Sequence, residues 1–136
     1  MDKTLSQLDS TYLFNLIAYN RTLKQRNTLL KNFHTTSYSD DLLSTYDQKL
    51  SELGTEIYLK RKECISLIID NLQNYYDFIA KKSEQVSVEY SSELHRGSFL
   101  DLLSENRKKD QILTFTSSGI HRDDFLFKIN SNSLKK

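Results

Sequence analysis

Tyr12 to Phe33, YLFNLIAYNRTLKQRNTLLKNF, is the stretch that decides the fold, because it lacks glycine and proline and repeats apolar residues in steps of four and three. Its apolar stripe consists of Tyr12, Leu16, Tyr19, Leu23, Leu30 and Phe33. These steps return to one face of an α-helix, and so narrow a stripe is typical of a helix that packs along another helix. The stripe has one break, at Arg26, where the pattern asks for an apolar side chain.

A second stripe with the same steps follows further along the chain. Its members are Leu43, Tyr46, Leu50, Leu53, Ile57, Cys64, Ile68, Leu72, Tyr75 and Ile79, with Lys60 or Arg61 at the one missing position. The polar segment 34–39 between the stripes is typical of a turn. The sequence therefore predicts two long antiparallel helices joined by a short connection.

The ends and length of these helices lead to further expectations. Asp9, Ser10 or Thr11 can cap the first helix, and Ser39 or Asp40 can cap the second. Forty residues of helix span about 60 Å, well beyond the about 33 Å of the first helix. We therefore expect the second helix to break near residues 70–71 or to pack its last part against another element. Gly54 inside this helix indicates a bend or a close approach, because glycine there costs about 1 kcal/mol.

Composition limits the class of protein. The 136 residues suit one domain, and the formal net charge of +1 argues against nucleic-acid binding through bulk charge. The single cysteine, Cys64, excludes an internal disulfide and lies on the second stripe, where a small hydrophobic role is expected. Neither a signal-peptide pattern nor an apolar run of about 20 residues is present, so we expect a soluble, cytoplasmic protein.

After residue 80 the pattern changes. Val86, Val88 and Tyr90 alternate with polar residues, which predicts a strand, and the ranges 112–116 and 125–129 are two more strand candidates. A short helix is expected from Phe99, capped by Ser98 and fading into the charged residues 106–110. The predicted fold class is α+β, mainly α: a coiled-coil-like helical arm at 1–80, then a small segment at 81–136 with short strands and one helix. The exposed strand edges indicate a missing partner.

Four polar residues between the last two predicted strands could carry chemistry: His121, Arg122, Asp123 and Asp124. A kinase-type catalytic loop needs an asparagine five residues after the aspartate, but Lys128 stands there. A metal site needs more ligands at regular spacing, and His34 and His95 are isolated. A structural charge network is the favoured interpretation, and no metal or catalytic residue is assigned.

A basic run on the first helix has two possible interpretations. Arg21, Lys24, Arg26 and Lys31 could contact phosphates, or they could form a solvated face with ion pairs to the second helix. The chain has no phosphate-binding loop, dinucleotide fingerprint, nucleophile elbow or paired CxxC motif. It therefore has no motif that holds a nucleotide by itself, and we predict no enzyme activity and no cofactor for this segment alone.

Three segments resemble the RecF family of bacterial recombination mediators. Residues 19–31, YNRTLKQRNTLLK, resemble that family's YN-x-x-L-x-QRN-x-LLK segment, and residues 47–61 resemble its second arm helix through DQKL, LG-x-x-I and Arg61. Residues 118–130 are similar to its GPHRDD-x-x-F-x-ING segment. Ile120 replaces the usual proline and Ser131 the usual glycine, which bears on turn geometry.

The resemblance implies a function for a longer protein. RecF proteins are SMC-like ATPases of the ABC class, and this chain resembles the arm between their two head lobes, without the ATPase motifs. The intact protein would bind ATP with magnesium, dimerise head to head and bind single-stranded or gapped DNA. With RecO and RecR it would load RecA in gap repair, replication recovery and the SOS response.

The resemblance also gives roles to the two polar groups. Arg21, Lys24, Arg26 and Lys31 become a hypothesis for DNA or RecR contact, and residues 121–124 one for holding the returning strand to the head. Two other interpretations stay open. The chain could be a free-standing helical-hairpin adaptor that binds proteins, or a metal-dependent hydrolase that uses His121 to Asp124.

Overall fold

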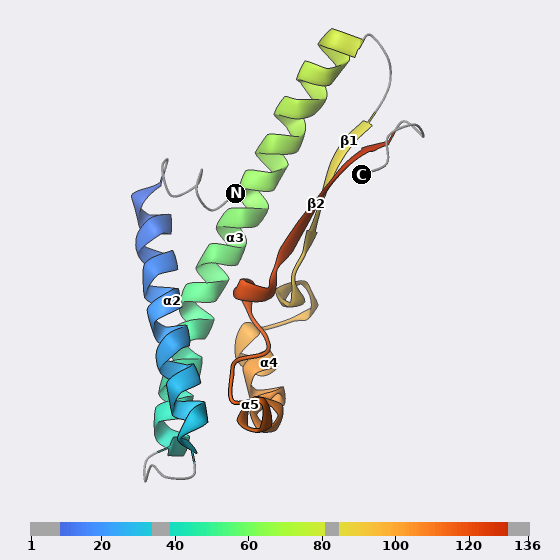
Figure 1. Cartoon of the computed structure of the whole chain (residues 1–136). Helices are drawn as coiled ribbons and strands as arrows, with labels where there is room; N and C mark the ends of the chain where they lie inside the picture. The colour runs from blue at the N-terminus through green and yellow to red at the C-terminus, as the bar shows by residue number, and fades with distance from the viewer. Residues whose placement is uncertain (1–8, 34–38, 81–84, 131–136) are drawn as a thin grey trace.

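The structure, a computed structural model, describes residues 9–33, 39–80 and 85–130, and two long antiparallel helices dominate it (Figure 1). Helix α2 spans Ser10–Lys31 and α3 spans Ser39–Ala80. Residues 34–38 of the expected turn at 34–39, the leading residues 1–8 and Ser131 lie outside the described residues, and Ser39 begins α3. The prediction of a helical hairpin followed by a small α+β segment is confirmed.

The start of α2 has one of the capping residues that the sequence offers. The Asp9 side chain accepts a hydrogen bond of 3.1 Å from the backbone N–H of Tyr12, so Asp9 caps α2. Helix α3 begins at Ser39, so the two predicted caps, Ser39 and Asp40, lie inside its first turn instead of preceding it. Asp40 and Asp41 there interact favourably with the helix dipole.

Helix α3 is continuous over 42 residues, so the alternative with a break near residues 70–71 is wrong. The other expectation was that the last part of this helix packs against another element, and it is confirmed. The part of α3 that extends past α2 lies beside a two-stranded antiparallel sheet (Figure 1). Strand β1 spans Gln85–Ser91 and β2 spans Asp124–Asn130. Tyr90 pairs with Phe125 in this sheet, and their rings stack with centroids 4.8 Å apart.

Two α-helices lie between the strands, where the sequence predicted one helix and a further strand. Helix α4 spans Phe99–Glu105 with Ser98 as its cap, as predicted, but α5 spans Arg107–Leu113. The prediction of a strand at 112–116 is therefore wrong. Its first two residues end α5, and Thr114 has a left-handed backbone with φ of 65°. Short 3₁₀ turns at Glu93–Arg96 (η2) and Ile120–Arg122 (η3) complete the path.

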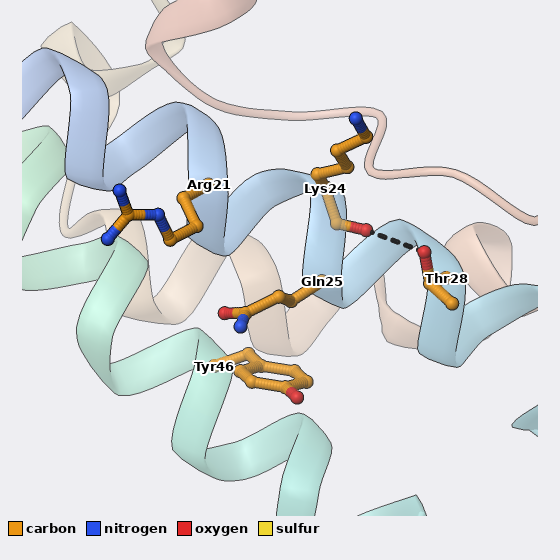
Figure 2. A pocket seen from close by; sticks show the side chains of 5 residues that line it. All are labelled: Arg21, Lys24, Gln25, Thr28 and Tyr46. Carbon is orange, nitrogen blue, oxygen red and sulfur yellow. Dashed lines mark hydrogen bonds between the residues drawn. The ribbon is translucent and has the colours of Figure 1, made fainter.

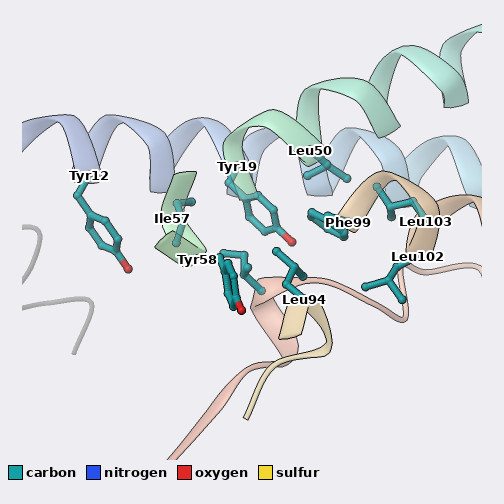
Figure 3. Packing of buried hydrophobic residues seen from close by; sticks show 10 residues of the cluster. Tyr12, Tyr19, Leu50, Ile57, Tyr58, Leu94, Phe99, Leu102 and Leu103 are labelled. Atoms are coloured by element: carbon teal, nitrogen blue, oxygen red, sulfur yellow. The ribbon is translucent and has the colours of Figure 1, made fainter. Parts of the chain in front are cut away.

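The main core lies where the hairpin meets residues 85–130, which we name the returning segment (Figure 3). Tyr12 and Tyr19 of α2 and Leu50 and Ile57 of α3 are buried there with Phe99 of α4. The remaining core residues are Tyr58, Leu94, Leu102, Leu103 and Ile120. Residues 94–120 thus supply core that the hairpin needs.

Gly54 is explained by a close approach to this core. A Cβ atom at Gly54 would lie 2.6 Å from the Phe99 ring and 3.2 Å from the Tyr19 ring. The helix remains continuous through this position. Of the two sequence interpretations, the structure supports the close approach.

We predict that Gly54→Ala destabilises the fold despite the better helix propensity of alanine. Overpacking costs about 1–3 kcal/mol and the helix gain returns up to about 1 kcal/mol, so the free energy of unfolding should fall by about 1–2 kcal/mol in urea titration. Ser66→Ala, at an exposed position of the same helix, is the matched control. Phe99→Leu should relieve the clash in the double variant. A Gly54→Ala protein as stable as its parent would contradict this packing.

Candidate functional site

Two buried arginines, one from each long helix, connect the returning segment to the hairpin. Arg26 of α2 is completely buried, and its Nε lies 2.6 Å from Asp47 Oδ1 of α3. Its Nη1 lies 2.9 Å from Asp110 Oδ2 of α5. One guanidinium therefore joins three helices, and each of the two carboxylates belongs to a different one.

The partners of Arg26 are themselves hydrogen-bonded. The other oxygen of Asp47 accepts a 2.9 Å bond from Arg107 Nη2, and the other oxygen of Asp110 accepts from the backbone N–H and hydroxyl of Ser117. Thr116 accepts from Arg26 through its hydroxyl oxygen and donates to Asn27 Oδ1. Buried charges are tolerated when they are paired and hydrogen-bonded in this way.

Arg61 forms the second connection. Its Nη1 lies 3.0 Å from Asp123 Oδ2 and donates to the Ile120 carbonyl at 3.0 Å, and its Nε donates to the Tyr12 hydroxyl. The Tyr90 hydroxyl donates to the same Asp123 oxygen at 2.5 Å. Burial, together with the Asp123 carboxylate, raises the pKa of Tyr90, so Tyr90 keeps the proton that it donates.

His121 links α2 to the loop that follows α5. Its Nε2 lies 3.0 Å from the Thr116 carbonyl oxygen, which can only accept, so Nε2 carries the proton. Nδ1 then accepts from the Tyr19 hydroxyl at 2.9 Å. Burial raises the pKa of Tyr19 and lowers the pKa of His121, so both groups stay neutral at neutral pH. The pair acts as a neutral hydrogen-bonded link.

The four residues 121–124 are thus not gathered into one site. His121 and Asp123 point inward to different partners, whereas Arg122 and Asp124 are exposed and have no ion pair to another described residue. Asp124 accepts a hydrogen bond from the backbone N–H of Phe125. Across residues 9–33, 39–80 and 85–130, no three His, Cys, Asp or Glu side chains are grouped to hold a metal ion.

The basic run on α2 divides between two faces. Arg21, Lys24 and Lys31 are exposed and have no ion pair within the described part of the chain, whereas Arg26 is buried. At about 100° per residue, Arg26 lies about 140° around the helix from Arg21. Arg26 is therefore excluded from the surface that was expected to contact DNA or RecR. The three exposed residues recur in steps of three and seven along one side, a surface that we name the basic stripe.

A shallow pocket of about 350 Å³ lies beside the basic stripe, between α2 and α3. Its lining residues are Arg21, Lys24, Gln25, Thr28 and Tyr46 (Figure 2). In this view Gln25 extends toward the Tyr46 ring and the Arg21 guanidinium lies to one side of them, whereas the Lys24 amine points away. The pocket brings a cation, an amide and an aromatic ring together.

The sequence named some of these residues and missed others. Asp47, Asp110 and Thr116 had no assigned role, although an arginine in an apolar stripe signals buried carboxylates. Arg61 was considered, with Lys60, for the missing position of the second stripe and belongs to a segment that resembles RecF, but it had no predicted ion pair. Cys64 is half-buried, and burial raises the pKa of its thiol, which disfavours the nucleophilic thiolate. None of the helices described has the length and apolar character needed to cross a membrane.

Comparison with known proteins gives one consistent result. The chain is 45% identical to the DNA replication and repair protein RecF of Flavobacterium johnsoniae over 100% of its own length and 38% of the relative. It is 33% identical to RecF of Phocaeicola vulgatus over 85% of its length and 30% of the relative. No protein-family model matches. The chain thus spans 30% to 38% of the length of these two relatives.

Solved structures agree with the sequence relatives. The chain superposes on the recombination mediator protein RecF with ATP, in the RecFOR pathway, with a TM-score of 0.83 and 29% identity. The match covers 95% of this chain and 37% of that one. An ATPγS form of RecF gives a TM-score of 0.80 at 28% identity.

We predict that Arg26→Met strongly destabilises the protein, because it leaves Asp47 and Asp110 buried without their shared cation. Breaking a buried pair costs about 3–5 kcal/mol, measured as the loss in free energy of unfolding. Arg21→Met, at an exposed position of the same helix, should change it by less than about 0.5 kcal/mol. Equal effects of the two substitutions would contradict the network.

His121 predicts a dependence of stability on pH. Burial lowers its pKa from the ordinary 6.5, so below pH 6.5 the unfolded chain binds more protons than the folded chain. The stabilising contribution is present above pH 6.5 and is lost as pH falls through the lowered pKa. His121→Gln should flatten this loss in urea titrations, whereas His95→Gln, at an exposed histidine, should keep it. An NMR titration midpoint for His121 at or above 6.5 would contradict the prediction.

Proposed function

We propose that this chain, which is a relative of the RecF proteins and matches about a third of their length, is the arm of a recombination mediator. Residues 1–80 form the arm and residues 81–136 return toward an ATPase head outside this chain. The resemblance in sequence and the superposition on RecF with ATP support this proposal.

The whole protein would bind ATP and magnesium in its head and dimerise head to head in the cytoplasm. It would bind single-stranded or gapped DNA and act with RecO and RecR to load RecA. The naming of relatives as DNA replication and repair proteins, and of the RecFOR pathway, supports this assignment. We place no nucleotide-binding or catalytic residue on this chain.

The arm itself would contact DNA phosphates through the basic stripe, Arg21, Lys24 and Lys31. The observation that carries this proposal is the absence of ion pairs at three exposed cations along one side of α2, within the described residues. The other cations of the hairpin include Arg26 and Arg61, and buried carboxylates neutralise both of them. Free cations on a rigid helix are suited to phosphate contact, which positions a protein on DNA without reading its sequence.

Binding of the 136-residue chain to a gapped duplex, followed by fluorescence anisotropy, tests this proposal. Changing Arg21, Lys24 and Lys31 together to Gln should weaken binding and reduce the slope of log K against log salt by up to about 3, because each phosphate contact contributes about 0.9. The matched control changes Lys62, Lys108 and Lys109 to Gln, which removes the same charge from other exposed positions. Equal losses in both triple variants would indicate bulk charge alone, and no binding by the parent chain would contradict the proposal.

A further inference from the structure

The pocket beside the basic stripe differs from the rest of the stripe in having an aromatic wall. Tyr46 is half-buried and packs against the buried cluster of Leu29, Leu30 and Leu43, so its ring is held in place by apolar contacts on one side. On the other side it lines the open pocket (Figure 2). A ring fixed in this way can accept a flat ligand with little loss of conformational freedom.

Most tyrosines in the described residues have no such role. Tyr12, Tyr19 and Tyr58 are buried in the main core, and Tyr90 stacks on Phe125. Tyr75 is 63% exposed and lies near the C-terminal end of α3. Tyr46 is the tyrosine that the structure places beside basic-stripe residues, with Arg21 and Lys24 lining the same pocket.

The polar groups around Tyr46 are complementary to a nucleotide. Arg21 offers a guanidinium for a phosphate, and the Gln25 amide, which can donate and accept, extends toward the ring where it could meet a base edge. The hydroxyl of Thr28 already donates to the Lys24 carbonyl at 3.0 Å, so its oxygen remains as an acceptor. The volume of about 350 Å³ lies at the lower end of the about 300–1,000 Å³ of small-molecule sites.

We propose that this pocket binds one unstacked nucleotide of a single-stranded DNA segment, with its base on Tyr46 and its phosphate on Arg21. The inference rests on the proposed DNA contact and adds to it a preference for single-stranded over double-stranded DNA. Bases in a duplex are stacked on one another and cannot reach Tyr46, whereas a single strand presents its bases to an aromatic ring. The arm would then distinguish the single-stranded part of a gap from its flanking duplex.

The test compares a ten-nucleotide thymidine strand with an abasic strand of the same length and charge, each binding to the 136-residue chain. The thymidine strand should bind about fivefold or more tightly, because stacking on an aromatic side chain strengthens binding at each base. Tyr46→Leu, which keeps an apolar side chain against the leucine cluster, should remove this difference. Tyr46→Phe should retain it. In the parent chain, the Gln25 side-chain amide NMR signals should shift with the thymidine strand and not with the abasic one.

The outcomes separate the two proposals. Equal affinity of the parent chain for both strands would overturn the nucleotide pocket, and this measurement needs no variant to fold. If the triple Gln variant still binds the gapped duplex more weakly than the parent chain in that case, the phosphate contact stands without the base contact. Thymidine monophosphate should compete only at far higher concentration than the strand. Equal competition would overturn the assignment to a strand and identify a free-nucleotide site.

Discussion

The structure depends on the cost of placing Arg26 in the interior. A buried guanidinium is tolerated only when charged and hydrogen-bonding partners surround it. Here those partners are Asp47 of α3 and Asp110 of α5, at 2.6 and 2.9 Å. Because each carboxylate belongs to a different helix, the hairpin and the returning segment satisfy the charge together. Neither the hairpin nor the returning segment alone supplies both carboxylates.

This constraint also separates two populations of charge. Arg26 and Arg107 face Asp47 and Asp110, so this network contains as many positive as negative groups. The basic stripe on the opposite side of α2 has no such compensation among the described residues. A formal net charge of +1 for the whole chain therefore conceals a local excess of positive charge. Local excess, rather than the total, governs contact with a polyanion.

The sequence predicted elements that a single periodicity determines. The stripes of α2 and α3, the cap at Asp9 and the strands around Val88 and Phe127 all follow local patterns. It did not predict α5, because the alternating residues 112–116 favour a strand locally. In α5, Asp110 contacts Arg26 of α2, and its second oxygen accepts from Ser117, so these contacts favour the helical path. Arg26 is 84 residues away from Asp110 in the sequence, and no local window contains that contact.

The same limit explains the candidate site. Position 26 continues the apolar stripe in steps of three and four, from Leu23 to Leu30, so the periodicity already placed Arg26 inside. The grouping of Arg26 with Arg21, Lys24 and Lys31 was based on charge alone and neglected the face of the helix on which each residue lies. Tyr46 shows the converse, since its stripe position indicated core and the structure leaves one side of its ring on an open pocket. Periodicity identifies the face of a helix that packs, but the neighbouring helix determines where that packing ends. Residues at this boundary can support the core and still meet a ligand.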